Sequence, residues 1–245
     1  MTRILEICVD SAEGLEAAIA GGADRIELCS ALALGGLTPS VGLMSHAARA
    51  TVPVLAMIRP RAGGFDWRGD EIAMMEAEIA AAAAQAGLAG VVIGATTTTD
   101  AGTALDAPTL ERLAIAAGDM DITLHRCIDV VDDPLAALDL AVDLGIRRVL
   151  SSGGAASAPE GAARLAEMMR HAAGRLTVMP GAGINPATLP GLLSALDPAE
   201  VHASASKPDP GPETLARLGF HPKGARRTDA ATVAELKRIL SAQAG

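Results

Sequence analysis

The sequence is poor in aromatic residues and in cysteine. It has one Trp, two Phe and no Tyr among 245 residues, and its three cysteines are Cys8, Cys29 and Cys127. So few cysteines, in odd number, exclude a disulfide scaffold and suit a reducing compartment. We therefore expect free thiols in a cytoplasmic protein. No C-x-x-C pair is present, so a closed zinc site with four nitrogen and sulfur ligands is not indicated.

The chain also lacks a long apolar run and an excess of positive charge. No stretch reaches the roughly 20 apolar residues that cross a bilayer, and the first three residues lead into a strand pattern instead of a signal-peptide core. Because 29 acidic residues outnumber 20 basic ones, the net charge of -9 argues against nucleic acid or an anionic membrane as the main partner. A metal ion or a small molecule is the expected ligand, and a homo-oligomer remains possible.

What the sequence does contain is a repeated unit, in which a short apolar strand ends in polar residues and an alanine-rich helix follows. The unit occurs eight times, with the first strand near residues 3–8 and the last near residues 200–205. This pattern predicts an α/β protein with a single (β/α)₈ barrel of the TIM type over residues 1–245, since such barrels take about 250 residues. A doubly wound open sheet ranks second, because the first turn lacks a G-x-G-x-x-G phosphate loop.

One segment does not fit the repeat. Residues 206–228 are rich in Pro and Gly and lie between the last strand and the last helix. We expect them to form an irregular excursion, either at the barrel mouth or as an arm that faces a partner.

Strand alternation predicts which polar side chains point into the barrel. Glu6 shares a face with Cys8, and Glu27 shares a face with Cys29, while the residues between them are apolar. The same parity gives a set of candidate catalytic residues at the C-terminal ends of the strands, where the sites of such barrels lie. They are Glu6, Glu27, Arg59, His125 and His202.

These five residues suit proton transfer on an anionic or oxygen-rich compound. The carboxylates and imidazoles could share acid and base roles, and Arg59 could neutralise the charge of the substrate. The alternative is structural: Glu6 and Glu27 would form ion pairs with Arg59, and the two histidines would be core residues with satisfied hydrogen bonds.

Two further groups of residues are candidates for binding. Because neighbouring strands lie about 4.8 Å apart, Cys8 and Cys29 could hold a soft cation such as Cu(I), although free cysteines are often simply buried. Glycine-rich loops after the sixth and seventh strands could bind an anion through backbone N–H groups, or could only close tight turns. The loop residues are Ser152, Gly153, Gly181 and Gly183.

Several stretches resemble the signature of the CutC family of copper homeostasis proteins: LEICVDS, GGADRIELCSAL, GGLTPS, MIRPR, LHRCIDV, LSSGG and VMPGAGI. The resemblance implies a TIM-type barrel, and it implies Cu(I) binding at Cys8 and Cys29, which match the two cysteines of the family. The chain departs from the family at residues 62–66 and 125–129, where it reads AGGFD and HRCID. Two functions therefore stand open: a cytoplasmic Cu(I)-binding protein, or a barrel enzyme of isomerase or lyase type acting on a small polyhydroxylated or phosphorylated compound.

Overall fold

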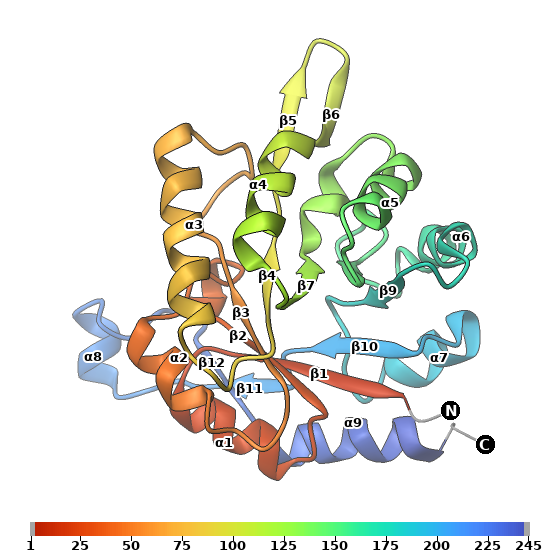
Figure 1. The fold of residues 1–245 in the computed structure, drawn as a ribbon. Coiled ribbons are helices and arrows are strands. Elements are labelled where there is room, and N and C mark those ends of the chain that lie inside the picture. Colours follow the sequence, from red (N-terminus) through yellow and green to blue (C-terminus); the bar gives the residue numbers. More distant parts are fainter. Residues whose placement is uncertain (1–2, 243–245) are drawn as a thin grey trace.

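The computed structural model describes residues 3–242, and these contain an eight-stranded parallel sheet curled into a barrel (Figure 1). Its strands are β1 (Ile4–Val9), β2 (Arg25–Leu28), β3 (Val54–Met57), β4 (Gly90–Ile93), β7 (Asp121–Leu124), β8 (Arg148–Ser151), β9 (Thr177–Pro180) and β10 (Glu200–Ala203). The sheet order is β10-β1-β2-β3-β4-β7-β8-β9, and β9 lies beside β10 where the barrel nearly closes. The predicted (β/α)₈ barrel is confirmed, and the open doubly wound sheet is wrong.

Helices cover the outside of the barrel (Figure 1). They are α1 (Ala12–Ala20), α2 (Val41–Ala47), α3 (Gly69–Ala83), α4 (Ala107–Ala117), α5 (Pro134–Asp143), α6 (Ala162–Ala172), α7 (Leu189–Leu196) and α9 (Ala230–Ala242). Several of these helices have an N-cap residue whose side-chain oxygen accepts a backbone hydrogen bond. In α1, Ser11 accepts from Gly14 N–H at 3.0 Å, which satisfies a backbone donor of the first turn. None of the described helices is both long and apolar enough to cross a membrane.

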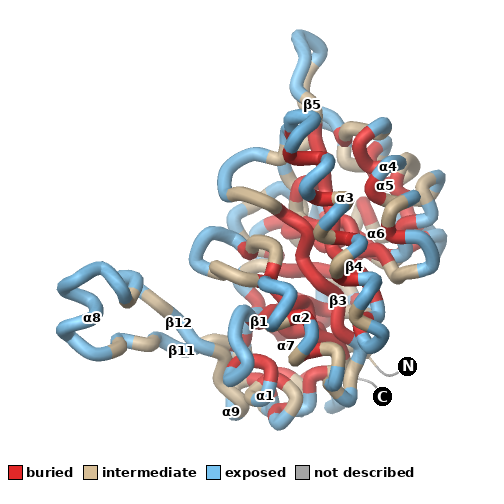
Figure 2. Tube along the Cα trace, turned by 60° about the vertical axis from the view of Figure 1, so that its left-hand side comes forward, coloured by how far each residue is buried: buried red, intermediate tan, exposed pale blue. Residues whose placement is uncertain are grey.

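The core lies mainly between the strands and these helices. Outward-facing strand residues such as Leu5, Ile26 and Val201 are fully buried there, which stabilises the fold by about 1.5–3 kcal/mol for each large side chain. Figure 2 shows the buried residues running through the body of the barrel. The strand residues that alternate with these point to the barrel axis, and the charged side chains are among them. The apolar and charged residues therefore lie on opposite faces of the strands, as the alternation in the sequence predicts.

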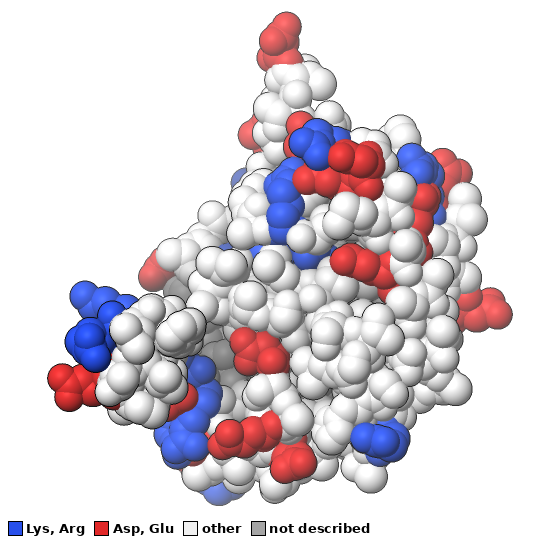
Figure 3. All heavy atoms as spheres, turned by 90° about the vertical axis from the view of Figure 1, so that its left-hand side faces the viewer, with Lys and Arg blue, Asp and Glu red and all other residues white. Residues whose placement is uncertain are grey.

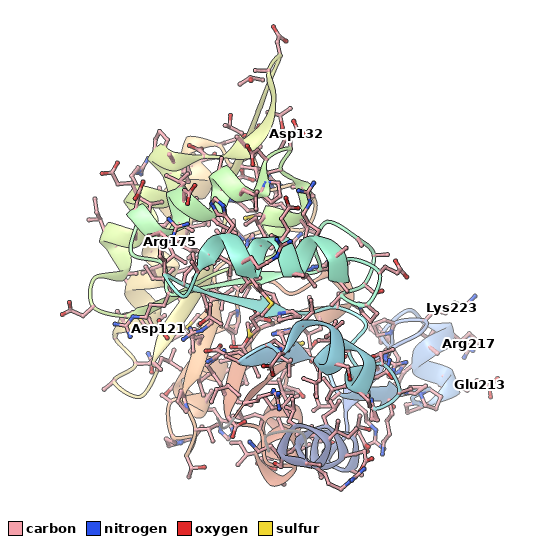
Figure 4. All side chains as sticks on the ribbon, turned by 90° about the vertical axis from the view of Figure 1, so that its right-hand side faces the viewer. Asp121, Asp132, Arg175, Glu213, Arg217 and Lys223 are labelled. Carbon is pink, nitrogen blue, oxygen red and sulfur yellow. The ribbon has the colours of Figure 1, made fainter. Side chains whose placement is uncertain are left out.

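Residues 206–228 form an arm that contains regular elements, where the sequence indicated an irregular excursion. β11 (Ser206–Pro208) and β12 (Arg226–Thr228) pair as an antiparallel ribbon, and a short helix, α8 (Glu213–Arg217), lies at its far end. This arm projects away from the barrel, with most of its length exposed (Figure 2). Charged side chains gather on it, Arg217 and Lys223 among them (Figures 3 and 4).

A second projection, a hairpin of β5 (Thr96–Thr99) and β6 (Gly102–Leu105), follows β4 and was not predicted. Asp132 lies beside it (Figure 4), and its carboxylate accepts a hydrogen bond from Thr103 N–H at 2.8 Å. A run of threonines has high strand propensity, which is the signal that could have shown this hairpin.

Candidate metal and ligand site

A cavity of about 690 Å³ opens at the C-terminal ends of the strands. Of the predicted site residues, its wall includes Cys8, Glu27, Arg59, His125, Gly183 and His202. The barrel therefore brings four of the five candidate catalytic residues to one cavity. Glu6 is fully buried and lies beneath the wall, where it contacts His202.

Cys8, Glu27 and His202 form a compact group with metal-ligand chemistry. One ligand atom from each lies within 4.8 Å of the other two, and all three side chains are buried. Strand register produces this grouping, because Cys8 is opposite Glu27 on β2, and β1 also pairs with β10, which carries His202. Thiolate, carboxylate and imidazole are all metal-ligating groups, so these three side chains could hold a metal ion together.

Glu6 orients the imidazole of His202. Its Oε1 lies 2.8 Å from His202 Nδ1, while His202 Nε2 lies 3.8 Å from Glu27 Oε2. Burial alone would lower the pKa of His202, but the negative charge of Glu27 helps to raise the pKa well above its usual value. The raised pKa favours the protonated imidazole, and a metal ion would have to displace the proton on Nε2.

The two glutamates have opposite electrostatic environments. Burial would raise the pKa of Glu6, but the hydrogen bond with His202 and the charge of Arg25 outweigh it, and the pKa falls to about 2. Burial raises the pKa of Glu27, and the charge of Glu6 adds to this effect. Oε1 of Glu27 has no hydrogen-bond partner among the described residues.

Glu6 also belongs to a layer of ion pairs below the cavity, which we call the lower layer. It consists of Glu6, Arg25, Asp121, Arg148 and Glu200. Arg25 pairs with both Glu6 and Glu200, and Arg148 pairs with Asp121 at 2.8 Å and with Glu200 at 3.2 Å. Asp121 lies on the side of the barrel away from the arm (Figure 4). The expected structural pairing of Glu6 and Glu27 with Arg59 is therefore wrong, since Arg25 is the partner of Glu6.

The lower layer was missed, although strand alternation contains its signal. Arg25 precedes Glu27 by two residues, and Glu200 precedes His202 by two, so each points to the same face as the predicted site residue.

Arg59 and His125 occupy another part of the wall. Arg59 Nη1 donates to the carbonyls of Leu34 and Gly36 at 3.0 and 2.9 Å, and Nη2 donates to Gly63 O at 2.9 Å. The Phe65 ring contacts both polar groups, because its centroid is 5.2 Å from Arg59 Cζ and 4.8 Å from the centroid of the His125 ring.

His125 is neutral in this environment. Burial and the charge of Arg59 lower its pKa to about 3. Nδ1 lies 3.1 Å from Cys127 N–H and accepts its hydrogen bond, so the remaining ring proton is on Nε2. At neutral pH His125 is thus a hydrogen-bond donor, which does not suit the acid or base role expected of it.

Phe65 and Trp67, which share a loop, differ in position. Phe65 lines the cavity. Trp67 is buried, and its Nε1–H donates to Gly94 O at 2.9 Å, so it anchors the loop to the barrel.

The three cysteines are free thiols and are buried, as expected for free cysteines. Cys8 lines the cavity. Cys29 is fully buried in a small inner cluster with Leu55 and Met57, and its Sγ donates to Glu27 Oε2 at 3.6 Å. The structure therefore places Cys8 in the metal-ligand group and Cys29 behind Glu27. Cys127 packs in the outer core.

The loop after β8 binds a carboxylate of the chain itself. Ser152 N–H lies 3.0 Å from both carboxylate oxygens of Asp129, and Gly154 N–H lies 3.1 Å from Asp129 Oδ1. Gly153 N–H donates to Ser151 Oγ at 2.8 Å. The backbone N–H groups of Ser152 and Gly153, which were expected to bind an anion, thus already donate to side chains of this chain. Gly181 N–H also has a partner, because it donates to Ser151 O at 2.9 Å. Of the four loop residues that were expected to bind an anion, Gly183 is the one that lines the cavity.

Comparison with known proteins identifies the family. The model of the CutC family matches residues 3–207. The chain belongs to the CutC family. A family protein CutC from Sinorhizobium medicae is 51% identical over 246 residues, covering 100% of this chain and 99% of that protein. The resemblance seen in the sequence is confirmed.

Solved structures agree with this assignment. A CutC structure from Streptococcus agalactiae, named for copper homeostasis, is 26% identical with a TM-score of 0.77, covering 82% of this chain and 98% of that one. KGPDC from Streptococcus mutans has a TM-score of 0.61 at 12% identity and shares the fold alone. The CutC family match ends where the arm begins, whereas the Sinorhizobium protein aligns over the whole chain, arm included.

Proposed function

We propose that this CutC-family chain binds Cu(I) at the barrel mouth through Cys8, His202 and Glu27. The observation that carries the proposal is the grouping of their ligand atoms within 4.8 Å. A thiolate and an imidazole are ligands that suit Cu(I), and the carboxylate of Glu27 offers an oxygen without a hydrogen-bond partner among the described residues. The donor set therefore fits the ion that the family name implies.

The surrounding residues would prepare this group for a metal. The Glu6 carboxylate holds His202 Nδ1, which leaves Nε2 to face Cys8 and Glu27, and Arg25 holds Glu6 from below. Such outer hydrogen bonds orient a ligating imidazole, and their loss commonly costs about 10–100-fold in metal affinity. Because Cys8 must stay a free thiol and copper must stay as Cu(I), the site needs a reducing compartment, and we place the protein in the cytoplasm.

Anaerobic Cu(I) titration against a competing chromophoric chelator tests the proposal. Cys8→Ser is expected to weaken Cu(I) binding at least about tenfold, and Glu6→Gln is expected to weaken it by about 10–100-fold. Cys127→Ser is the matched control, because that thiol is equally buried but lies in the outer core. Unchanged affinity in Cys8→Ser would overturn the proposal. An equal loss in Cys29→Ser would add Cys29 to the ligand set.

A second candidate function is an enzyme of isomerase or lyase type on a small polyhydroxylated or phosphorylated compound. The observation that favours it is the cavity of about 690 Å³, which exceeds the space of one ion and matches the pockets of small-molecule sites, about 300–1,000 Å³. A melting-shift screen of sugar phosphates and polyols tests this candidate, and the absence of any shift across the panel would remove it.

A further inference from the structure

Three residues that line the cavity each carry a buried polar side-chain atom with no hydrogen-bond partner among residues 3–242. These atoms are Glu27 Oε1, Arg59 Nε and His125 Nε2, and their residues are 3%, 6% and 3% exposed. An unsatisfied buried polar group costs about 1–3 kcal/mol, so three at one cavity need an explanation. A polar ligand would supply it.

The other two unsatisfied atoms have a different setting. Asp121 Oδ1 and Arg148 Nε lie in the lower layer, and each still faces an opposite charge, at 3.7 Å from Arg147 and 3.2 Å from Glu200. Arg59 Nε and His125 Nε2 lack an opposite charge of this kind, and both residues line the cavity, which has room for a ligand.

Arg59 contributes an uncompensated positive charge. Its two Nη atoms are held by three backbone carbonyls, and within the described part of the chain no carboxylate forms an ion pair with it. The Nε–H group remains as a donor. A buried guanidinium without a counter-charge strongly favours the binding of an anion.

His125 contributes a second donor. Since Nδ1 accepts the Cys127 N–H group, the neutral ring carries its proton on Nε2, and this N–H is unsatisfied. The Phe65 ring packs against both His125 and Arg59, which fixes the two donors on one part of the wall.

We propose that Arg59 Nε–H and His125 Nε2–H bind an oxyanion, the carboxylate or phosphate group of a small molecule that enters the cavity. Glu27 Oε1, on the wall formed by β2, would accept a hydroxyl of the same molecule, so the ligand class is a small oxygen-rich acid or phosphate ester. The inference rests on the second candidate function, in which the cavity is a small-molecule pocket. Arg59 and His125 are outside the proposed Cu(I) site, which shares only Glu27 with these three ligand-binding groups, so anion binding by the two donors does not require copper. Anion binding without turnover would leave the inference standing.

The test uses inorganic phosphate and acetate as probes, at constant ionic strength adjusted with sodium chloride, because exposed charges respond to salt alone. The readout is the ¹⁵N resonance of His125 Nε2 in the full chain, together with the melting temperature of each variant. Arg59→Lys keeps the positive charge but loses Nε–H, and His125→Leu loses the ring donor. Arg226→Gln is the matched control, since Arg226 lines the same cavity but is exposed.

We expect saturable binding of at least one probe with a Kd of about 1 mM or tighter, and a shift of the His125 signal. Arg59→Lys should weaken binding at least about tenfold, as loss of a hydrogen bond to a charged group does, while Arg226→Gln stays within about twofold. Tighter phosphate binding would indicate a phosphate ester, and tighter acetate binding a carboxylic acid. The proposal is overturned if neither probe saturates, or if Arg226→Gln loses as much affinity as Arg59→Lys in variants that melt normally.

Discussion

The lower layer and the cavity wall are built from the same kinds of residue in the same barrel interior, yet they differ in how their charges are paired. In the lower layer, Arg25 and Arg148 each contact two carboxylates. On the wall, the Arg59 guanidinium donates hydrogen bonds only to backbone carbonyls, and the Nε2–H group of His125 has no acceptor, among the described residues. Both regions are buried, so burial does not distinguish them. The pairing of charges does.

This difference assigns different roles to the two regions. A buried ion pair becomes costly when one partner is removed, because the other is left as an uncompensated charge. A buried polar group without a partner is already costly in the folded state, and such groups are typical of binding sites. The lower layer should therefore respond to mutation as structure, and the wall as a ligand site.

The largest expected effect is the loss of Arg25. Arg25→Met would leave Glu6 and Glu200 buried without their shared cation, and we expect the free energy of unfolding to fall by about 3–5 kcal/mol. Urea denaturation at pH 7 measures it. Arg112→Gln is the control, since the Arg112 pair with Glu76 is exposed and worth less than about 1 kcal/mol. A loss for Arg25→Met no larger than the control would mean that the lower layer is not structural.

The next effect concerns pH and His125. Burial lowers its folded pKa to about 3, whereas the unfolded value is about 6.5. Between these pH values the unfolded state binds one more proton than the folded state, so this residue makes stability fall as pH falls through that window.

The expected slope from His125 approaches about 1.4 kcal/mol per pH unit. His125→Gln removes the titrating group but keeps an N–H donor, and its unfolding free energy should fall less steeply from pH 6.5 toward pH 3. Paired urea titrations across this range give the slopes. Parallel curves for wild type and variant would show that the imidazole is not buried and neutral.

The repeated strand–helix unit was sufficient to predict the barrel, and strand alternation was sufficient to predict four of the charged or titratable side chains on the cavity wall. Glu27, Arg59, His125 and His202 reach one cavity because a period of two fixes the face of each side chain once the fold is known. Alternation could not show which charges would pair, because that depends on stagger between strands. Arg25 and not Arg59 meets Glu6, since β1 and β2 pair with Glu6 opposite Arg25.

Loops and short strands escaped prediction for a different reason. The donors of Ser152 and Gly154 are satisfied by Asp129, a contact across about two dozen residues that no local pattern contains. The arm strands β11 and β12 have three residues each, too few for a period to be recognised among Pro and Gly.

A smaller effect is expected for Glu27. Glu27→Gln replaces a desolvated carboxyl group whose Oε1 is unsatisfied, while Glu6 continues to hold His202. We expect the free energy of unfolding to stay within about 1 kcal/mol of wild type, or to rise, as it commonly does when a strained functional group is removed. The same denaturation assay, with Cu(I) titration alongside, measures both properties. A loss of about 3 kcal/mol or more would place Glu27 with the lower layer as a structural residue.

The smallest effect is expected for Phe65, which supports the two free donors of the wall. Its ring lies 5.2 Å from Arg59 Cζ, a cation–π contact worth about 0.5–1 kcal/mol at a partly exposed position. Phe65→Leu keeps apolar packing but removes the ring face, so stability should fall by about 1 kcal/mol or less. If the ring holds Arg59 and His125 in place for a ligand, phosphate or acetate binding should weaken several-fold in the same variant. A stability loss with unchanged anion binding would mean that the carbonyls of Leu34, Gly36 and Gly63 alone position Arg59, and that the wall needs no aromatic support.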